Sequence, residues 1–137
     1  MSGQDIIKNR KEIFIEPDTI LVSQTDEKGI INFVNDDFCK VTGYTVKELL
    51  GKSHNLLRHP YMPDGAFKEL WETIKNGNIW TGYLKNQTKN GDFFWVYATI
   101  YPIVNHFGIK GYTACRRRVE SFELEQIKIL YSSDFYS

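Results

Sequence analysis

The sequence predicts an α+β domain in which several helices cover one face of a five-stranded antiparallel sheet. Two short β-rich runs come first, segments with helical periodicity follow, and three more β-rich runs precede a last helical segment. Consecutive strands joined by short turns pair antiparallel, so both groups of strands are expected in one sheet. The length of 137 residues suits a single compact domain with a buried core.

The first two strands lie in the run TILVSQTDEKGIINFVN, where Asp26 to Gly29 separate two short β-rich segments. Gly29 supplies the positive φ that a tight hairpin connection needs. Residues 1–17 precede this hairpin and mix charged side chains with apolar ones such as Ile13 and Phe14. They are expected to form a short amphipathic helix or arm that caps the domain.

Helical segments are expected between residues 35 and 77. Asn35 is a capping residue ahead of a helix that Gly43 ends, and Thr45 with Glu48 has the spacing of a capping box. A longer helix starts near Pro63, a residue that favours the first helical turn. Its apolar residues at i, i+3, i+4 and i+7 are Phe67, Leu70, Trp71 and Ile74. This stripe is expected to lie in the core.

Three strands are predicted after Ile79. Asn90-Gly91 joins the first two, and a turn near Gly108 leads to the third. Alternation along the second strand divides its side chains between two fairly apolar faces. One face carries Phe94, Val96, Ala98 and Ile100.

The composition excludes several classes of function. The 17 basic and 17 acidic residues cancel, so no charge excess indicates a nucleic acid as partner. The sequence has no long apolar run, so no membrane segment is expected. Cys39 and Cys115 are interpreted as reduced thiols, which favours a cytoplasmic protein. No nucleophile and base stand out and the three histidines lack metal-ligand spacing, so neither an enzyme nor a metal site is expected.

Between residues 18 and 118 the sequence resembles the PAS domains, a family of sensor modules. The resemblance rests on the segments TDEKGIINFVNDDFCKVTGYTVKELLGK, KNGDFFWVYATIYPI and IKGYTACRR. Within this family it is similar to the flavin-binding PAS domains of aerotaxis and energy-taxis receptors. That similarity is carried by His54-Asn55, the run from Arg58 to Pro63, Trp80-Thr81-Gly82 and Lys85-Asn86. It implies a PAS fold that holds FAD between sheet and helices and senses redox, energy or oxygen status.

The resemblance also implies a set of cofactor-binding residues. They are Asn35, Arg58, His59, Trp80, Asn86, Val96 and Ala98. Arg58 and His59 would line the entrance, and a guanidinium there would favour the more negative, reduced flavin. Asn86 would face the uracil-like edge of the ring, because a carboxamide offers both a donor and an acceptor. Trp80 would pack nearby, and the small Ala98 would leave room for the ring.

Tyr61 departs from the family pattern, which has an aspartate between the His-Pro and Met-Pro pairs. The change removes an acceptor for a cofactor hydroxyl, and two alternatives to FAD stay open. One is a cofactor-free interaction and dimerisation module whose pocket is filled by side chains such as Tyr61. The other is a haem-binding gas sensor ligated by His54 or His59.

Residues 119–137 are expected to form a signalling helix that follows the sensor domain of residues 18–118. Its apolar stripe consists of Val119, Phe122, Ile127 and Leu130. This stripe would dock a partner or a second copy of the chain, unless the helix packs back on its own sheet. The signal would reach the helix through one face of the last strand, formed by Tyr112, Ala114 and Arg116. The expected partner is a chemotaxis-type receptor or another signalling protein, and the expected assembly is a homodimer through the terminal helices.

Overall fold

The computed structural model describes residues 10–60 and 62–132 of the chain. In chain order, the elements are β1 (Ile20–Asp26), β2 (Ile31–Val34), α2 (Asp36–Thr42), α3 (Val46–Leu49), the 3₁₀ helix η1 (His54–Leu57), α4 (Asp64–Lys75), β3 (Trp80–Gln87), β4 (Phe93–Asn105), β5 (Gly108–Arg118) and α5 (Ser121–Ser132). The five strands form one antiparallel sheet in the order β2-β1-β5-β4-β3. This confirms the predicted α+β fold.

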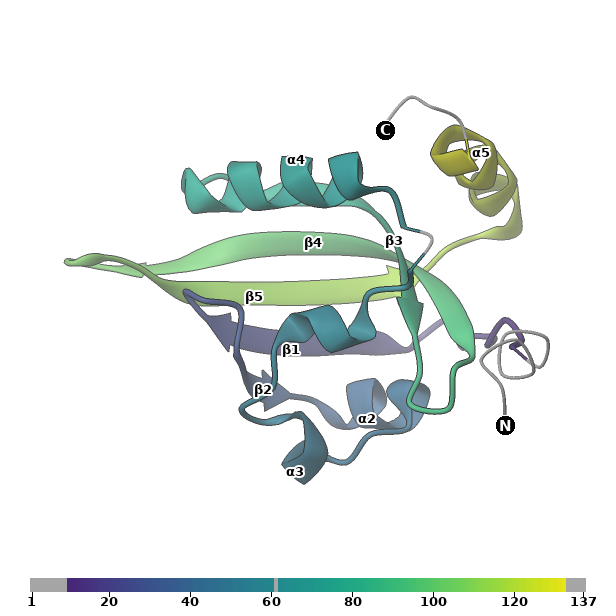
Figure 1. Ribbon diagram of the computed structural model, residues 1–137, viewed down its shortest axis with the longest axis horizontal. Helices are drawn as coiled ribbons and strands as arrows, with labels where there is room; N and C mark the ends of the chain where they lie inside the picture. Colours follow the sequence, from purple (N-terminus) through teal and green to yellow (C-terminus); the bar gives the residue numbers. More distant parts are fainter. Residues whose placement is uncertain (1–9, 61, 133–137) are drawn as a thin grey trace.

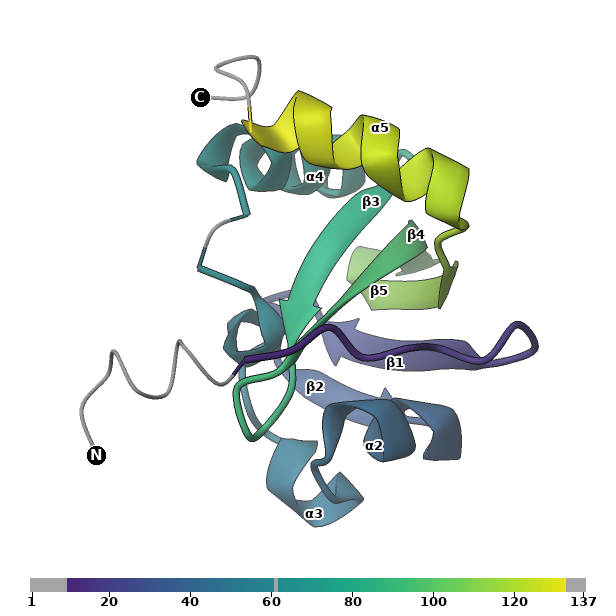
Figure 2. The same cartoon turned by 90° about the vertical axis from the view of Figure 1, so that its right-hand side faces the viewer.

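The sheet separates two layers of helices. Figure 1 shows α4 running along β4, with α2 and α3 beside β1 and β2. Helix α5 instead lies beside β3 (Figure 2), where Val119 and Ile127 bury Trp95 on the second face of the sheet. The first part of β4, residues 93–100, is therefore buried or half-buried on both of its faces, which explains why both were apolar in the sequence.

The local signals in the sequence form as expected. The Asn35 side chain accepts a hydrogen bond from the backbone N–H of Phe38, and Gly43 ends α2 with a φ of 81°. Thr45 and Glu48 form both hydrogen bonds of a capping box. Since these side chains satisfy backbone donors at the helix ends, the two short helices need little length of their own to be stable.

The N-terminal arm corrects one expectation. Residues 10–17 contain no helix; Glu12 forms an isolated parallel β-bridge with Phe93, and the N–H of Ile13 donates to the carbonyl of Phe93 over 2.7 Å. Along this segment the half-buried Ile13, the exposed Phe14 and the buried Ile15 alternate, which is the period of a strand. The remaining residues of the predicted arm, 1–9, lie outside the described part of the chain.

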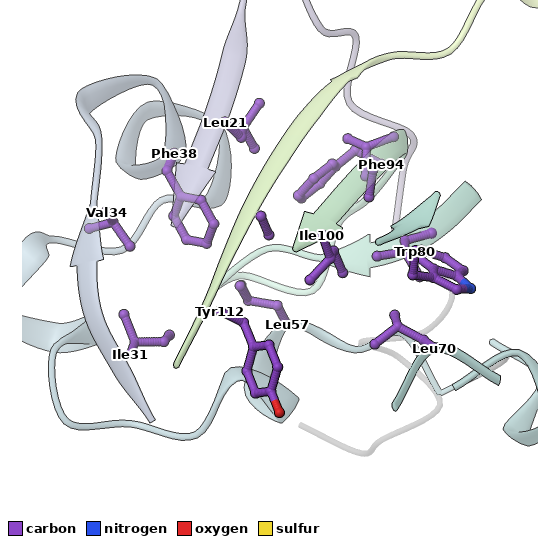
Figure 3. Close-up of a cluster of buried hydrophobic side chains, with 14 of the residues drawn as sticks. Leu21, Ile31, Val34, Phe38, Leu57, Leu70, Trp80, Phe94, Ile100 and Tyr112 are labelled. Atoms are coloured by element: carbon purple, nitrogen blue, oxygen red, sulfur yellow. The ribbon is translucent and has the colours of Figure 1, made fainter. Parts of the chain in front are cut away.

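The main core fills the space between the sheet and the first helical layer. In Figure 3, Phe38 and Leu70 from the helices point toward strand side chains that include Leu21 and Ile100. Gly82 matters here because a Cβ atom at this position would lie 2.5 Å from Cζ2 of Trp80. The indole of Trp80 therefore occupies the space that the glycine leaves open.

Candidate ligand site between the sheet and the helices

A cavity lies between the inner face of the sheet and the helices η1 and α4. Its volume is about 60 Å³. Small-molecule sites occupy roughly 300 to 1,000 Å³, so a ligand of that kind would need more space than the cavity has in this structure. The lining residues are Ser23, Thr25, His54, Asn55, Arg58, Phe67, Leu70, Trp71, Ile74, Leu84, Asn86, Ile100, Tyr112, Ala114 and Arg116. None of them carries a carboxylate.

The apolar wall of the cavity comes from α4. The stripe predicted to be core, from Phe67 to Ile74, lines the cavity directly. Trp71 packs edge-on against Tyr112 of β5, with the two ring centroids 5.8 Å apart. The stripe is thus part of the core and also forms one wall of the cavity. Helical periodicity alone does not reveal the second role.

Arg58 stands at the rim of the cavity with its charge already partnered. Its guanidinium forms an ion pair with Asp64 and donates to the carbonyl of Met62 over 3.3 Å. It also lies 4.1 Å from the ring centroid of Phe67. These contacts fix Arg58 as a link between η1 and the start of α4.

Asn86 presents an amide to the cavity from β3. The residue is 4% exposed and lines the cavity, and its carboxamide forms no hydrogen bond with any other described residue. Buried polar groups are nearly always paired in proteins. An unpaired donor and acceptor at this wall is therefore the arrangement expected of a residue that binds a ligand.

Arg116 enters the cavity from β5 and joins two elements. Its Nη2 donates to Oγ of Ser23 over 3.1 Å and to Nε2 of His54 over 2.7 Å. Because a guanidinium can only donate, Nε2 of His54 accepts, which assigns the proton of the neutral imidazole to Nδ1. The guanidinium carbon lies 5.3 Å from the ring centroid of Phe38.

Burial sets the protonation states around the site. Burial and then the neighbouring Arg116 lower the pKa of His54 to about 3. Burial and then the charges of Lys85 and Arg10 lower the pKa of His59 to about 4. Burial also lowers the pKa of Arg116 to about 10, a value that still leaves it charged at neutral pH. The cavity thus holds the neutral His54 beside the charged Arg116, and the neutral His59 lies outside the cavity.

The structure places the seven predicted site residues in different surroundings. Arg58 and Asn86 line the cavity together. Asn35 instead joins α2 to β1, accepting from the N–H of Val22 over 3.1 Å and donating to the carbonyl of Ile20 over 2.9 Å. His59 is buried against Phe93 outside the cavity. Three more predicted residues, Trp80, Val96 and Ala98, belong to the neighbouring core.

Sequence reasoning did not assign Arg116 or Ser23 to the site, and it named His54 only as a ligand of the alternative haem. A signal for Arg116 was nevertheless present, because alternation puts it on the same face of the last strand as Tyr112 and Ala114. A charged residue on an otherwise apolar strand face indicates either a strand end or a site. The contacts with His54 and Ser23 join segments distant in sequence, and no local pattern reveals them.

No group of three His, Cys, Asp or Glu side chains within residues 10–60 and 62–132 is placed to hold a metal ion. None of the helices in the same part of the chain is long and apolar enough to cross a membrane.

The fold and the cavity between sheet and helices are those of a PAS-type sensory domain, and the chain belongs to the PAS fold family. The family model, described as PAS fold, matches residues 31–112. The chain is 44% identical over 116 residues to the aerotaxis receptor of Escherichia coli, covering 85% of the chain and 23% of the receptor. It is 32% identical over 114 residues to the nitrogen fixation regulatory protein of Klebsiella pneumoniae, covering 82% of the chain and 23% of that protein. The chain therefore spans about a quarter of the length of these relatives.

Solved structures show the same fold. A light-oxygen-voltage domain studied with a flavin analogue superposes with a TM-score of 0.69 at 22% identity, covering 82% of the chain and 86% of that domain. At this identity the likeness concerns the fold alone.

Proposed function

We propose that this domain binds FAD in the cavity, senses redox, energy or oxygen status through it, and signals to a chemotaxis-type receptor or another output partner. The observation that carries the proposal is the polar pattern of the cavity. Asn86 and Arg116 offer unpaired hydrogen-bonding groups within apolar walls that contain no carboxylate. The similarity to an aerotaxis receptor supports a sensory role, and the flavin analogue of the light-oxygen-voltage domain supports a flavin.

The residues present fit the chemistry of a flavin. Bound FAD would supply reversible two-electron redox chemistry. The carboxamide of Asn86 matches an edge that both donates and accepts hydrogen bonds. Phe67 and Trp71 on α4 would cover the ring and exclude water. The cavity has room for a few water molecules, so binding of the flavin ring would require its walls to move apart.

The small enclosed volume favours a second candidate, a cofactor-free interaction module. The side chain expected to fill such a pocket, Tyr61, lies outside the described residues. Haem has less support, because Nε2 of His54 already accepts from Arg116 and His59 does not line the cavity. A haem iron needs an open imidazole nitrogen facing the pocket.

One experiment separates these candidates. The purified chain is titrated with oxidised FAD and then reduced with dithionite, while its absorption spectrum is recorded. Bound FAD should stay with the protein through gel filtration, so its absorption bands should remain. Reduction should bleach these bands. The variant Asn86→Leu should bind FAD roughly tenfold more weakly, because a ligand hydrogen bond is lost. Asn78→Leu is the matched control, since Asn78 is exposed.

The spectrum also gives the contrary outcomes. A colourless protein that takes up no FAD would favour the cofactor-free module, and a Soret band would show haem. Equal FAD affinities of Asn86→Leu and Asn78→Leu would remove Asn86 from the site.

We also propose that the chain forms a homodimer through its terminal segments and acts in the cytoplasm. Helix α5 divides the predicted apolar stripe. Of its members, Val119 and Ile127 are buried against the chain's own sheet, Leu130 is half-buried and Phe122 is 72% exposed. Ile129, outside the predicted stripe, is 71% exposed beside Phe122. The exposed pair supports contact with another chain. Sedimentation equilibrium of Phe122→Ser should show a weaker dimer than the wild type, and a wild-type monomer at all concentrations would overturn this assembly.

A further inference from the structure

Arg116 is a buried cation without a counterion. The residue is 1% exposed, and no Asp or Glu within the described part of the chain forms an ion pair with it. Its Nη2 has two neutral partners, Ser23 and His54. Its Nε and Nη1 are buried and have no acceptor among the described residues. A buried charged group with unpaired donors is costly, because it loses its hydration without replacement.

Arg58, the other arginine of the cavity, differs in each of these respects. It is paired with Asp64, and its side chain is 31% exposed. Its positive charge is therefore largely balanced by the chain and by solvent. The charge that a bound molecule would meet inside the cavity belongs to Arg116.

Arg116 lines the cavity between small and large neighbours. Its cross-strand partners are the small Ala98 on β4 and the larger Leu21 on β1. The next cavity residue along β5 is Ala114, which is also small. The Phe38 ring and the imidazole of His54 contact the guanidinium as well.

We propose that Arg116 is the residue that distinguishes the reduced from the oxidised cofactor, because its unpaired Nε and Nη1 donate to a ring atom that becomes more negative on reduction. This inference rests on the proposed binding of FAD. It transfers to Arg116 the electrostatic role that the sequence resemblance implied for Arg58. Nη2 of Arg116 donates to both Ser23 and His54. A stronger contact between Arg116 and the cofactor would therefore also alter the contact with His54 in η1.

The charge balance supports this preference. Two-electron reduction of the ring by an external donor, dithionite in the test, with uptake of one proton leaves a product with one negative charge more than the oxidised form. A guanidinium in a medium of low dielectric constant favours that product over the neutral ring. Linkage between binding and reduction then requires the reduced form to bind more tightly and the reduction potential to rise.

The test compares the affinities of the two redox forms. The variant Arg116→Gln should lose affinity for oxidised FAD by a smaller factor than for reduced FAD, because the oxidised ring carries less negative charge. Its affinity for FAD reduced anaerobically with dithionite should fall roughly ten- to a hundredfold, the range for a hydrogen bond to a charged group. Lys110→Gln is the matched control, since it removes the same charge from an exposed position of β5. Arg116→Lys should restore part of the preference.

Each outcome has one meaning. Equal losses of affinity for both forms in Arg116→Gln would show a merely structural role and overturn the inference, as would unchanged affinities. A wild type that binds neither form would overturn the proposed function instead.

A measurement on the wild type tests the inference even if Arg116→Gln does not fold. The Nε–H NMR signal of Arg116 should shift and exchange more slowly with solvent when bound FAD is reduced. An identical signal in both redox states would overturn the inference.

Discussion

At the scale of single residues, Asn35 shows how a side chain can resemble part of a site and yet hold the fold together. Its carboxamide bonds to three backbone groups, those of Ile20, Val22 and Phe38. All of its polar atoms are engaged by strand β1 and helix α2, whereas the Asn86 carboxamide is left to the cavity. The two asparagines thus have opposite roles, which their sequence surroundings do not distinguish.

Replacing Asn35 by alanine should destabilise the fold without emptying the site. Loss of a helix cap costs about 0.5 to 2 kcal/mol, and two further hydrogen bonds are lost here, so we expect a decrease of about 2 kcal/mol in the free energy of unfolding. Urea denaturation measures it, with Asn76→Ala as control because Asn76 makes one hydrogen bond at the exposed end of α4. An Asn35→Ala protein of normal stability that failed to bind FAD would contradict this role.

At the scale of elements, α5 is attached to the sheet by few side chains. Ile127 and Val119 bury Trp95, and the hydroxyl of Tyr131 donates to the carbonyl of Tyr83 over 2.8 Å. The opposite side of the helix exposes Phe122 and Ile129. The helix therefore has one face committed to its own domain and one face available for contact.

The variant Ile127→Ala should release α5 while leaving the sheet intact. Removing a buried aliphatic side chain leaves a cavity, and this lowers the free energy needed to open the helix locally. Amide exchange in α5 should accelerate roughly ten- to a hundredfold, whereas amides of β5 should keep their protection. Ile129→Ala is the control, because Ile129 is exposed. Uniform acceleration across the whole domain would show that α5 is part of one cooperative unit with the sheet.

The elements were predictable from the sequence to the extent that local chemistry determines them. The hairpin at Gly29, the cap at Asn35 and the turn at Asn90-Gly91 each act through residues a few positions apart. The cavity depends instead on pairs such as Ser23 and Arg116, which lie 93 positions apart. The resemblance to known sensors named two residues that line the cavity, Arg58 and Asn86, but which side chains face the cavity is decided by strand register.

At the scale of the whole molecule, the buried histidines make stability depend on pH. The folded-state pKa values of His54 and His59 are about 3 and about 4, below the ordinary value near 6.5. Below pH 6.5 the unfolded chain binds protons that the folded chain excludes, so the free energy of unfolding decreases as the pH falls toward 4. The slope is at most about 1.4 kcal/mol per pH unit for each proton.

Urea denaturation between pH 7 and pH 4 measures this dependence. His59→Phe should reduce the slope, since it removes one of the two buried groups. His106→Gln should leave the slope unchanged, because His106 is exposed. Identical slopes for His59→Phe and the wild type would show that His59 does not exclude a proton on folding.

Strand β3 lies between the ligand cavity and the residues that hold α5. Leu84 lines the ligand cavity, while the adjacent Tyr83 points to the other face and bonds to Glu123 and Tyr131 of α5. The ligand cavity and the contacts with α5 are thus separated by the thickness of one strand. An occupant that moved β3 outward would therefore also move the anchorage of α5. We expect the size of the occupant, as well as its charge, to affect the position of the C-terminal helix.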